Sequence, residues 1–170
     1  MFKRILVPVD GSQTATRALV AALQLARDGG ARVRLVNLAE DLASADSYDA
    51  CGGYSEELML ALRDGSQRVL ADAMAIAQSA GVEADTMLYD KFGKRLGEVI
   101  ANAARLWNAD LVVVGTHGRR GVGRMFLGSG AEQIIRLAPV PVLVYRSPDE
   151  SPAKAARATL PVRRADAAAG

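Results

Sequence analysis

Apolar positions along the chain follow two alternating spacings, which together predict five strands and four helices. Short runs of β-branched and aliphatic residues, typical of strands, cover residues 4–9, 32–38, 82–89, 110–114 and 141–146. Between them, apolar residues recur every three or four positions, as on one face of a helix, over residues 15–26, 56–78, 95–107 and a segment that follows Gly128. Strict alternation of strand and helix predicts an α/β fold: a single doubly wound five-stranded parallel sheet with right-handed crossovers and helices on both faces.

The same pattern predicts which side chains face the core. In the helix at 56–78 the expected buried stripe is Leu58, Leu62, Val69, Ala73, Ile76 and Ala77. In the helix at 95–107 it is Leu96, Val99, Ile100, Ala103 and Leu106. The run "DLVVV" at 110–114 is uninterrupted, which indicates a strand buried on both faces.

Length and composition indicate one domain over residues 1–146, followed by a tail. With 170 residues, half of them hydrophobic, the chain has room for one core. Residues 147–170 combine prolines and charges of both signs without apolar periodicity, so we expect a disordered tail. The segment 39–55 is longer than a typical connection, and the alternatives are a lid over the sheet's carboxyl edge and a floppy insertion.

The net charge, the apolar runs and the cysteine content indicate which kinds of partner and which cellular compartment to expect. A net charge of +2, with basic residues spread along the chain, argues against a general nucleic-acid surface. The apolar runs are too short for a secretory signal or a membrane span. Cys51 is the only cysteine, so no internal disulfide can form. We therefore expect a cytoplasmic protein with neither a nucleic-acid nor a membrane partner.

One stretch, "GTHGRRGVGRMFLGS" at 115–129, carries the strongest chemical signal. It is rich in glycine and contains three arginines, and it follows a predicted central strand. Ligands of doubly wound sheets bind outside the carboxyl ends of the strands, where the strand order reverses. If strands one and four are neighbours there, "VDGS" and "GTHG" face each other across that crevice.

The chemistry of this stretch fits a polyphosphate. Glycines at 115 and 118 allow close approach of the main chain, and a helix that begins near Gly128 and Ser129 offers free N–H groups to an anion. Ser129 and Glu132 have the spacing of a capping box. The alternative is that the glycines only make turns and that Ser129 only caps the helix.

Two better-known nucleotide motifs do not fit. "GRMFLGS" has the glycine spacing of a P-loop but places Ser129 where the lysine belongs. "GVGRMF" lacks the last glycine of a dinucleotide fingerprint.

The pattern G-x2-G-x9-G-[ST], formed by Gly115, Gly118, Gly128 and Ser129, fits better. With "ILVPVDGS" near the start and "APVPVLVYR" near the end, it resembles the ATP-binding branch of the universal stress protein family over residues 2–146. The resemblance implies strand order 3-2-1-4-5 and ATP in the crevice described above. The stretch "DKFGKRLGEV", after the third strand, departs from the turn common in that family.

The resemblance also implies site residues. Those expected around adenine and ribose are Pro8, Val9, Asp10, Leu38, Val114 and Gly115. Those expected at the phosphates are Gly118, Gly128, Ser129, Gly130 and Ala131, with His117 and Arg119 beside them.

Several roles stay open at this level. Arg119, Arg120 and Arg124 either pair with γ-phosphate oxygens or form a solvated loop. His117, the only histidine, is either catalytic or, as we expect, a hydrogen-bonding loop residue, because no nucleophile or metal-ligand pattern accompanies it. Asp10 either reaches a Mg²⁺ bound with ATP or serves only the turn.

These features favour an ATP-binding stress or signalling protein in which nucleotide occupancy changes the shape or the partners, with hydrolysis at most slow. The alternatives are a genuine ATPase or nucleotidyl transferase, and a scaffold of the same fold that binds no nucleotide. The last strand, Val142 to Arg146, is an apolar edge in the implied order, so we expect a homodimer through it. The downstream protein partner and the choice among ATP, AMP and a cyclic nucleotide are not encoded in these patterns.

Overall fold

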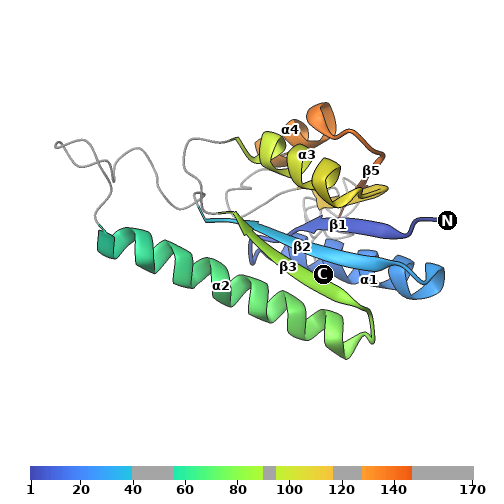
Figure 1. Ribbon diagram of the computed structural model, residues 1–170, viewed down its shortest axis with the longest axis horizontal. Helices are drawn as coiled ribbons and strands as arrows, with labels where there is room; N and C mark the ends of the chain where they lie inside the picture. Colours follow the sequence, from blue (N-terminus) through green and yellow to red (C-terminus); the bar gives the residue numbers. More distant parts are fainter. Residues whose placement is uncertain (40–55, 90–94, 117–127, 147–170) are drawn as a thin grey trace, which may run out of the picture.

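The computed structural model describes residues 1–39, 56–89, 95–116 and 128–146, and it confirms the alternation of strands and helices (Figure 1). The strands are β1 (Arg4–Pro8), β2 (Arg32–Leu38), β3 (Ala84–Tyr89), β4 (Leu111–Gly115) and β5 (Val142–Tyr145). The helices are α1 (Gln13–Gly29), α2 (Glu56–Ser79), α3 (Leu96–Trp107) and α4 (Ser129–Leu137). Expectations for the segment from residue 40 to 55, the stretch at 90–94 and the tail at 147–170 lie outside the described residues.

The five strands form one parallel sheet in the order β3-β2-β1-β4-β5, as expected. β1 lies in the middle, where Ile5 is in register with Val33 of β2 on one side and Leu111 of β4 on the other. The chain builds outward from β1 in one direction through β2 and β3, and in the other through β4 and β5. The point of reversal is therefore the boundary between β1 and β4, where a crevice opens at the carboxyl ends of doubly wound sheets.

Two apolar cores hold the helices on opposite faces of the sheet. Helices α1 and α2 cover one face, and α3 and α4 cover the other (Figure 1). Alternate strand residues point to opposite faces, so Val113 packs with the α1 and α2 core and Val112 with the α3 and α4 core. Every residue of β4 is buried, which confirms the strand predicted to be buried on both sides.

The predicted stripe of α2 is mostly confirmed. Leu62, Ala73 and Ala77 are buried, while Val69 and Ile76 are partly buried and pack against the same core. The prediction did not include two further buried residues, Ser66 and Leu70. The Leu58 side chain lies outside the described part of the chain.

The predicted stripe of α3 is wrong at one position. Leu106 is 72% exposed, whereas Val99, Ile100 and Ala103 are buried. At 100° per residue, Leu106 lies about 120° around the helix from Ile100. The helix buries Ala104 instead, on the other side of Ile100, because that side faces the sheet and α4.

Candidate functional site

The carboxyl end of β1 leads into a tight, hydrogen-bonded turn. Val9 follows the strand, and its N–H still donates to Val36 O of β2 over 2.9 Å. Asp10 Oδ1 then accepts a hydrogen bond of 2.9 Å from Ser12 N. Gly11 between them has a φ of 78°, a left-handed conformation that glycine adopts without strain. The turn thus places Pro8, Val9 and Asp10 at the carboxyl end of β1, beside the start of α1.

The same turn starts helix α1. Ser12 is its N-cap, and Ser12 Oγ accepts a hydrogen bond of 3.2 Å from Ala15 N. A serine in this position satisfies one of the free N–H groups of the first turn. The N-terminus of α1 is therefore already capped by protein.

The carboxyl end of β2 is joined to this turn by a side chain that the sequence analysis missed. Asn37 is buried, and its Nδ2 donates to Val9 O over 2.6 Å. Leu38, the last residue of β2, follows it and is partly buried. The signal that could have found Asn37 is a single amide residue within the apolar run "RVRLVNL".

The carboxyl end of β4 packs directly against the start of α1. A Cβ atom added to Gly115 would lie 2.9 Å from Thr14 Cγ2 and 3.0 Å from Thr14 O. Only a residue without a side chain fits at this distance. Val114 and Gly115 are both buried, so the expected ribose end of the site is formed by closely packed main chain.

The chain leaves β4 and returns to nearly the same point. Thr116 N donates to Tyr145 O over 3.0 Å, and Thr116 O accepts a hydrogen bond of 2.7 Å from Gly128 N. The second bond fixes the start of α4 beside the carboxyl end of β4. Residues 115 and 128, which are distant in the motif, are therefore brought together.

Helix α4 begins at Ser129, with Gly128 as an extended N-cap at φ −60° and ψ 145°. Glu132 N donates to Gly128 O over 3.0 Å. The N–H groups of Ser129, Gly130 and Ala131 lie in the first turn, where the helix has no carbonyl four residues earlier to accept their hydrogen bonds. Ser129 is exposed, whereas Ala131 is buried.

The predicted capping box at the start of α4 is wrong. A capping box requires serine at the N-cap and glutamate three residues further on. The N-cap is Gly128, which has no side chain to cap the helix, so Ser129 is already helical and Glu132 lies one position too late. The start is displaced because the bond from Gly128 to Thr116 holds Gly128 extended.

The remaining candidates lie outside the described residues. These are His117, Gly118 and Arg119, together with Arg120 and Arg124. Within the residues that the structure does describe, no group of three or more His, Cys, Asp or Glu side chains is arranged to hold a metal ion. Among the described helices, none has the length together with the hydropathy that a bilayer span requires.

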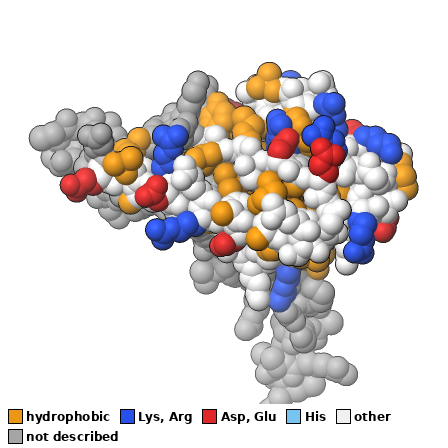
Figure 2. Space-filling model, turned by 60° about the horizontal axis from the view of Figure 1, so that its bottom comes forward, with side chains coloured by type: hydrophobic (Ala, Val, Ile, Leu, Met, Phe, Trp, Pro, Cys, Tyr) orange, Lys and Arg blue, Asp and Glu red, His pale blue; other side chains and the backbone are white. Residues whose placement is uncertain are grey.

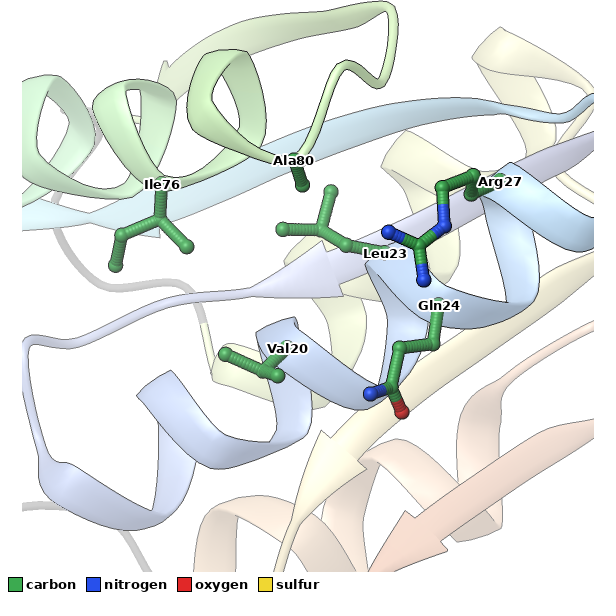
Figure 3. A pocket seen from close by; sticks show the side chains of 6 residues that line it. All are labelled: Val20, Leu23, Gln24, Arg27, Ile76 and Ala80. Carbon is green, nitrogen blue, oxygen red and sulfur yellow. The ribbon is translucent and has the colours of Figure 1, made fainter.

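A groove between α1 and α2 lies away from the carboxyl ends of the strands. The molecular face seen in Figure 2 shows apolar side chains between scattered charged ones. The groove is lined by Val20, Leu23, Gln24, Arg27, Ile76 and Ala80 (Figure 3). Its volume of about 160 Å³ is below the roughly 300 to 1,000 Å³ of typical ligand sites. Its lining residues come from the second half of α1 and from the end of α2. The groove is therefore far from Ser12, the N-cap of α1.

The fold agrees with comparisons to known proteins. The family model described as universal stress protein family matches residues 1–146, which is most of the chain. The chain belongs to the universal stress protein family.

Relatives of this universal stress protein cover most of its length. It is 37% identical over 147 residues to a universal stress protein of Thermus aquaticus, covering 86% of this chain and 100% of that protein. The crystal structure of a family member from Burkholderia pseudomallei is 35% identical, with a TM-score of 0.66 over 85% of this chain and 96% of that one. The universal stress protein of Archaeoglobus fulgidus in complex with dAMP is 25% identical, with a TM-score of 0.60 over 84% of this chain and 96% of that one.

Proposed function

We propose that this universal stress protein binds an adenine nucleotide, with ATP as the first candidate, in the crevice between β1 and β4. Occupancy of the site would change the conformation of the protein or its partners. The observation that carries this proposal is the hydrogen bond from Gly128 N to Thr116 O. It holds the N-terminus of α4, whose N-cap Gly128 has no side chain to cap it, beside the strand ends, and such a terminus attracts anions through its free N–H groups and the helix dipole.

The residues present fit such a ligand. Gly115 lets the start of α1 pack closely against the carboxyl end of β4, and the α4 N-terminus provides N–H donors, because its N-cap, Gly128, has no side chain to cap them. The dAMP complex of the Archaeoglobus fulgidus protein supports the choice of an adenine nucleotide. The phosphates of bound ATP would carry the negative charge that the N–H groups and the dipole of α4 attract.

Each predicted site residue then takes the role that the family resemblance implies. Base and ribose contacts are assigned to Pro8, Val9, Asp10, Leu38, Val114 and Gly115. Phosphate contacts are assigned to Gly118, Gly128, Ser129, Gly130 and Ala131, with His117 and Arg119 adjacent in the chain. We also propose a cytoplasmic location, consistent with a single cysteine.

Titration tests the proposal directly. Calorimetry of the purified full chain with ATP, AMP and cyclic AMP is expected to show saturable binding of at least ATP, with one nucleotide per chain. Mass spectrometry of the freshly purified protein would identify any nucleotide retained from the cell. Absence of binding for all three nucleotides up to millimolar concentration would overturn the proposal and favour the scaffold alternative.

We expect hydrolysis to be slow and independent of the only histidine. The substitution His117→Ala should change the single-turnover hydrolysis rate by less than about tenfold, because a positioned general base usually contributes about a hundredfold or more. Quenched-flow or radiolabel assays with enzyme in excess measure this rate. A larger loss would instead favour the ATPase or nucleotidyl transferase alternative.

We propose that the protein forms a homodimer through β5. This strand ends the sheet, with β4 as its only neighbour among the described strands. Val144 on β5 and Ile135 and Leu137 on α4 remain 36%, 43% and 42% exposed. An apolar strand edge of this kind needs to be covered or paired, and pairing with a second copy about a two-fold axis closes the assembly.

The substitution Val144→Pro should shift the dimer toward monomer without loosening the sheet. Pro141 O and Tyr145 O accept hydrogen bonds from Val112 N and Thr116 N, each over 3.0 Å. Successive residues of a strand direct their backbone groups to opposite sides, so the Val144 N–H faces away from β4. Proline removes that N–H from the outer edge only.

Sedimentation velocity at tens of micromolar protein measures the shift. The control Val144→Thr keeps the N–H and the branched shape and should leave the dimer intact. A wild-type protein that sediments as a monomer contradicts the dimer, and a proline variant that stays dimeric places the interface elsewhere.

A further inference from the structure

A buried side chain next to the proposed site has one unpaired polar atom. Asn37 on β2 is 5% exposed. Its Nδ2 is paired with Val9 O, but its Oδ1 is sealed from solvent and has no hydrogen-bond partner in the described part of the chain. A buried acceptor without a donor is unfavourable. A donor group on a ligand that reached Oδ1 would therefore gain more than an ordinary surface contact.

The identity of the unpaired atom as an acceptor follows from its neighbour. Val9 O lies 2.6 Å from the amide nitrogen of Asn37. Turning the amide over would place two oxygen acceptors at that distance, and they would repel each other. Asn37 therefore presents an oxygen, and not an NH₂ group, as its free atom.

The position of Asn37 places this acceptor near the proposed base. Asn37 follows Val36, the register partner of Pro8, and precedes Leu38 at the carboxyl end of β2. Val9, its hydrogen-bond partner, and Leu38, its neighbour in the chain, are both assigned to the base and ribose. The phosphate donors belong to α4, on the opposite side of β1 in the sheet order.

We propose that Asn37 is a specificity-determining residue that selects a purine with an exocyclic amino group at its 6-position over one with an oxo group there. Asn37 Oδ1 would accept a hydrogen bond from the amino group, whereas an oxo group would set two acceptors against each other. Because protein atoms cover Oδ1, the groups over it have to shift as the base enters. This inference rests on the proposed nucleotide site.

The test compares ATP with ITP, which differ in this group. Calorimetry of the full-length wild-type chain should show ATP binding about tenfold or more tighter than ITP. In Asn37→Leu, which has similar size and no polar side-chain atom, the ratio of the two affinities should fall to within about twofold. Loss of the hydrogen bond to Val9 weakens both nucleotides alike, so it cancels in the ratio.

Two further variants make the comparison secure. Asn37→Ser replaces the leucine variant if that one does not fold; its hydroxyl both donates and accepts, so it should also lose the preference. Asn102→Ala changes an asparagine of α3 outside the proposed site and should keep the wild-type ratio. Thermal unfolding monitors the fold of each variant.

The outcomes separate this inference from the function on which it rests. If the wild type binds ATP but does not prefer it to ITP, or if the Asn37 variants keep the preference, Asn37 does not select the base and the nucleotide site stands. If the wild type binds neither nucleotide, the nucleotide site is wrong and the role of Asn37 falls with it.

Discussion

Replacing Ser129 with aspartate is expected to weaken ATP binding about a hundredfold while leaving the protein at least as stable as the wild type. Ser129 is the exposed first residue of α4. A carboxylate in the first turn of a helix interacts favourably with the helix dipole. The same carboxylate repels a phosphate bound there, and a like charge about 5 Å away at an effective dielectric constant of about 20 accounts for a loss of this size.

The opposite signs of these two effects make the Ser129→Asp experiment specific. Ser129→Asn is the matched control, because asparagine has the shape of aspartate without its charge; we expect it to lose about tenfold or less. Calorimetry gives the affinities, and urea denaturation gives the free energies of unfolding. Equal ATP affinities for the aspartate and asparagine variants would show that phosphate does not bind at the α4 N-terminus.

Replacing Gly97 with alanine is expected to lower the free energy of unfolding by about 2 kcal/mol, a typical effect of overpacking. A Cβ atom at Gly97 would lie 2.7 Å from Gln133 O and 2.8 Å from Gln133 C. Both contacts are with backbone atoms of α4, which cannot rotate away as a side chain can. The two helices have to separate, and the resulting drop in the melting temperature should be about 4 to 8 °C.

The effect should reach the proposed site as well. Gln133 lies in the same short helix as Ser129 and Gly130, and a Cβ atom at Gly130 would itself meet Leu96 Cδ2 of α3 at 2.8 Å. Displacing α4 therefore moves its N-terminal donors relative to Thr116. We expect Gly97→Ala to weaken ATP binding in addition to lowering stability, and titration below the melting transition measures this.

Gly65→Ala provides the control for the loss of a glycine in a helix. Gly65 lies within α2, and nothing comes within 4 Å of a Cβ atom added there. Alanine favours the helix over glycine by about 0.5 to 1 kcal/mol, so this variant should be more stable than the wild type. If Gly97→Ala were equally well tolerated, α3 and α4 would not pack as closely as described.

The sequence determined the elements of this protein and their parallel arrangement. The strand at 32–38 is predicted to the residue, and the helix at 56–78 differs from α2 by one residue at its end. Both follow from local periodicity, which requires only that one face or both faces of an element be apolar. The strand order came from the likeness to a known family and is confirmed by the sheet.

The candidate site was predictable in part, through the strand ends and the glycine motif. The glycine-rich stretch and the family resemblance both placed residues 115 and 128 in one predicted site, and the structure joins the two ends of the stretch through the hydrogen bond between Thr116 and Gly128. The roles of Pro8, Asp10, Leu38 and the other proposed contacts stay predictions. The serine and glutamate spacing at the start of α4 suggested a capping box because sequence spacing alone does not fix the residue at which a helix begins.

Only the tertiary structure decided the features on which the sharpest experiments rest. The pairing of Asn37 with Val9 joins residues 28 apart, and the contact of Gly97 with Gln133 joins residues 36 apart. Leu106 is exposed because the sheet and α4 together set which side of α3 is covered. Periodicity predicts that one face of an element is buried, but it does not identify the residues that this face packs against or the distance between them. These partners and distances depend on contacts between segments far apart in the chain.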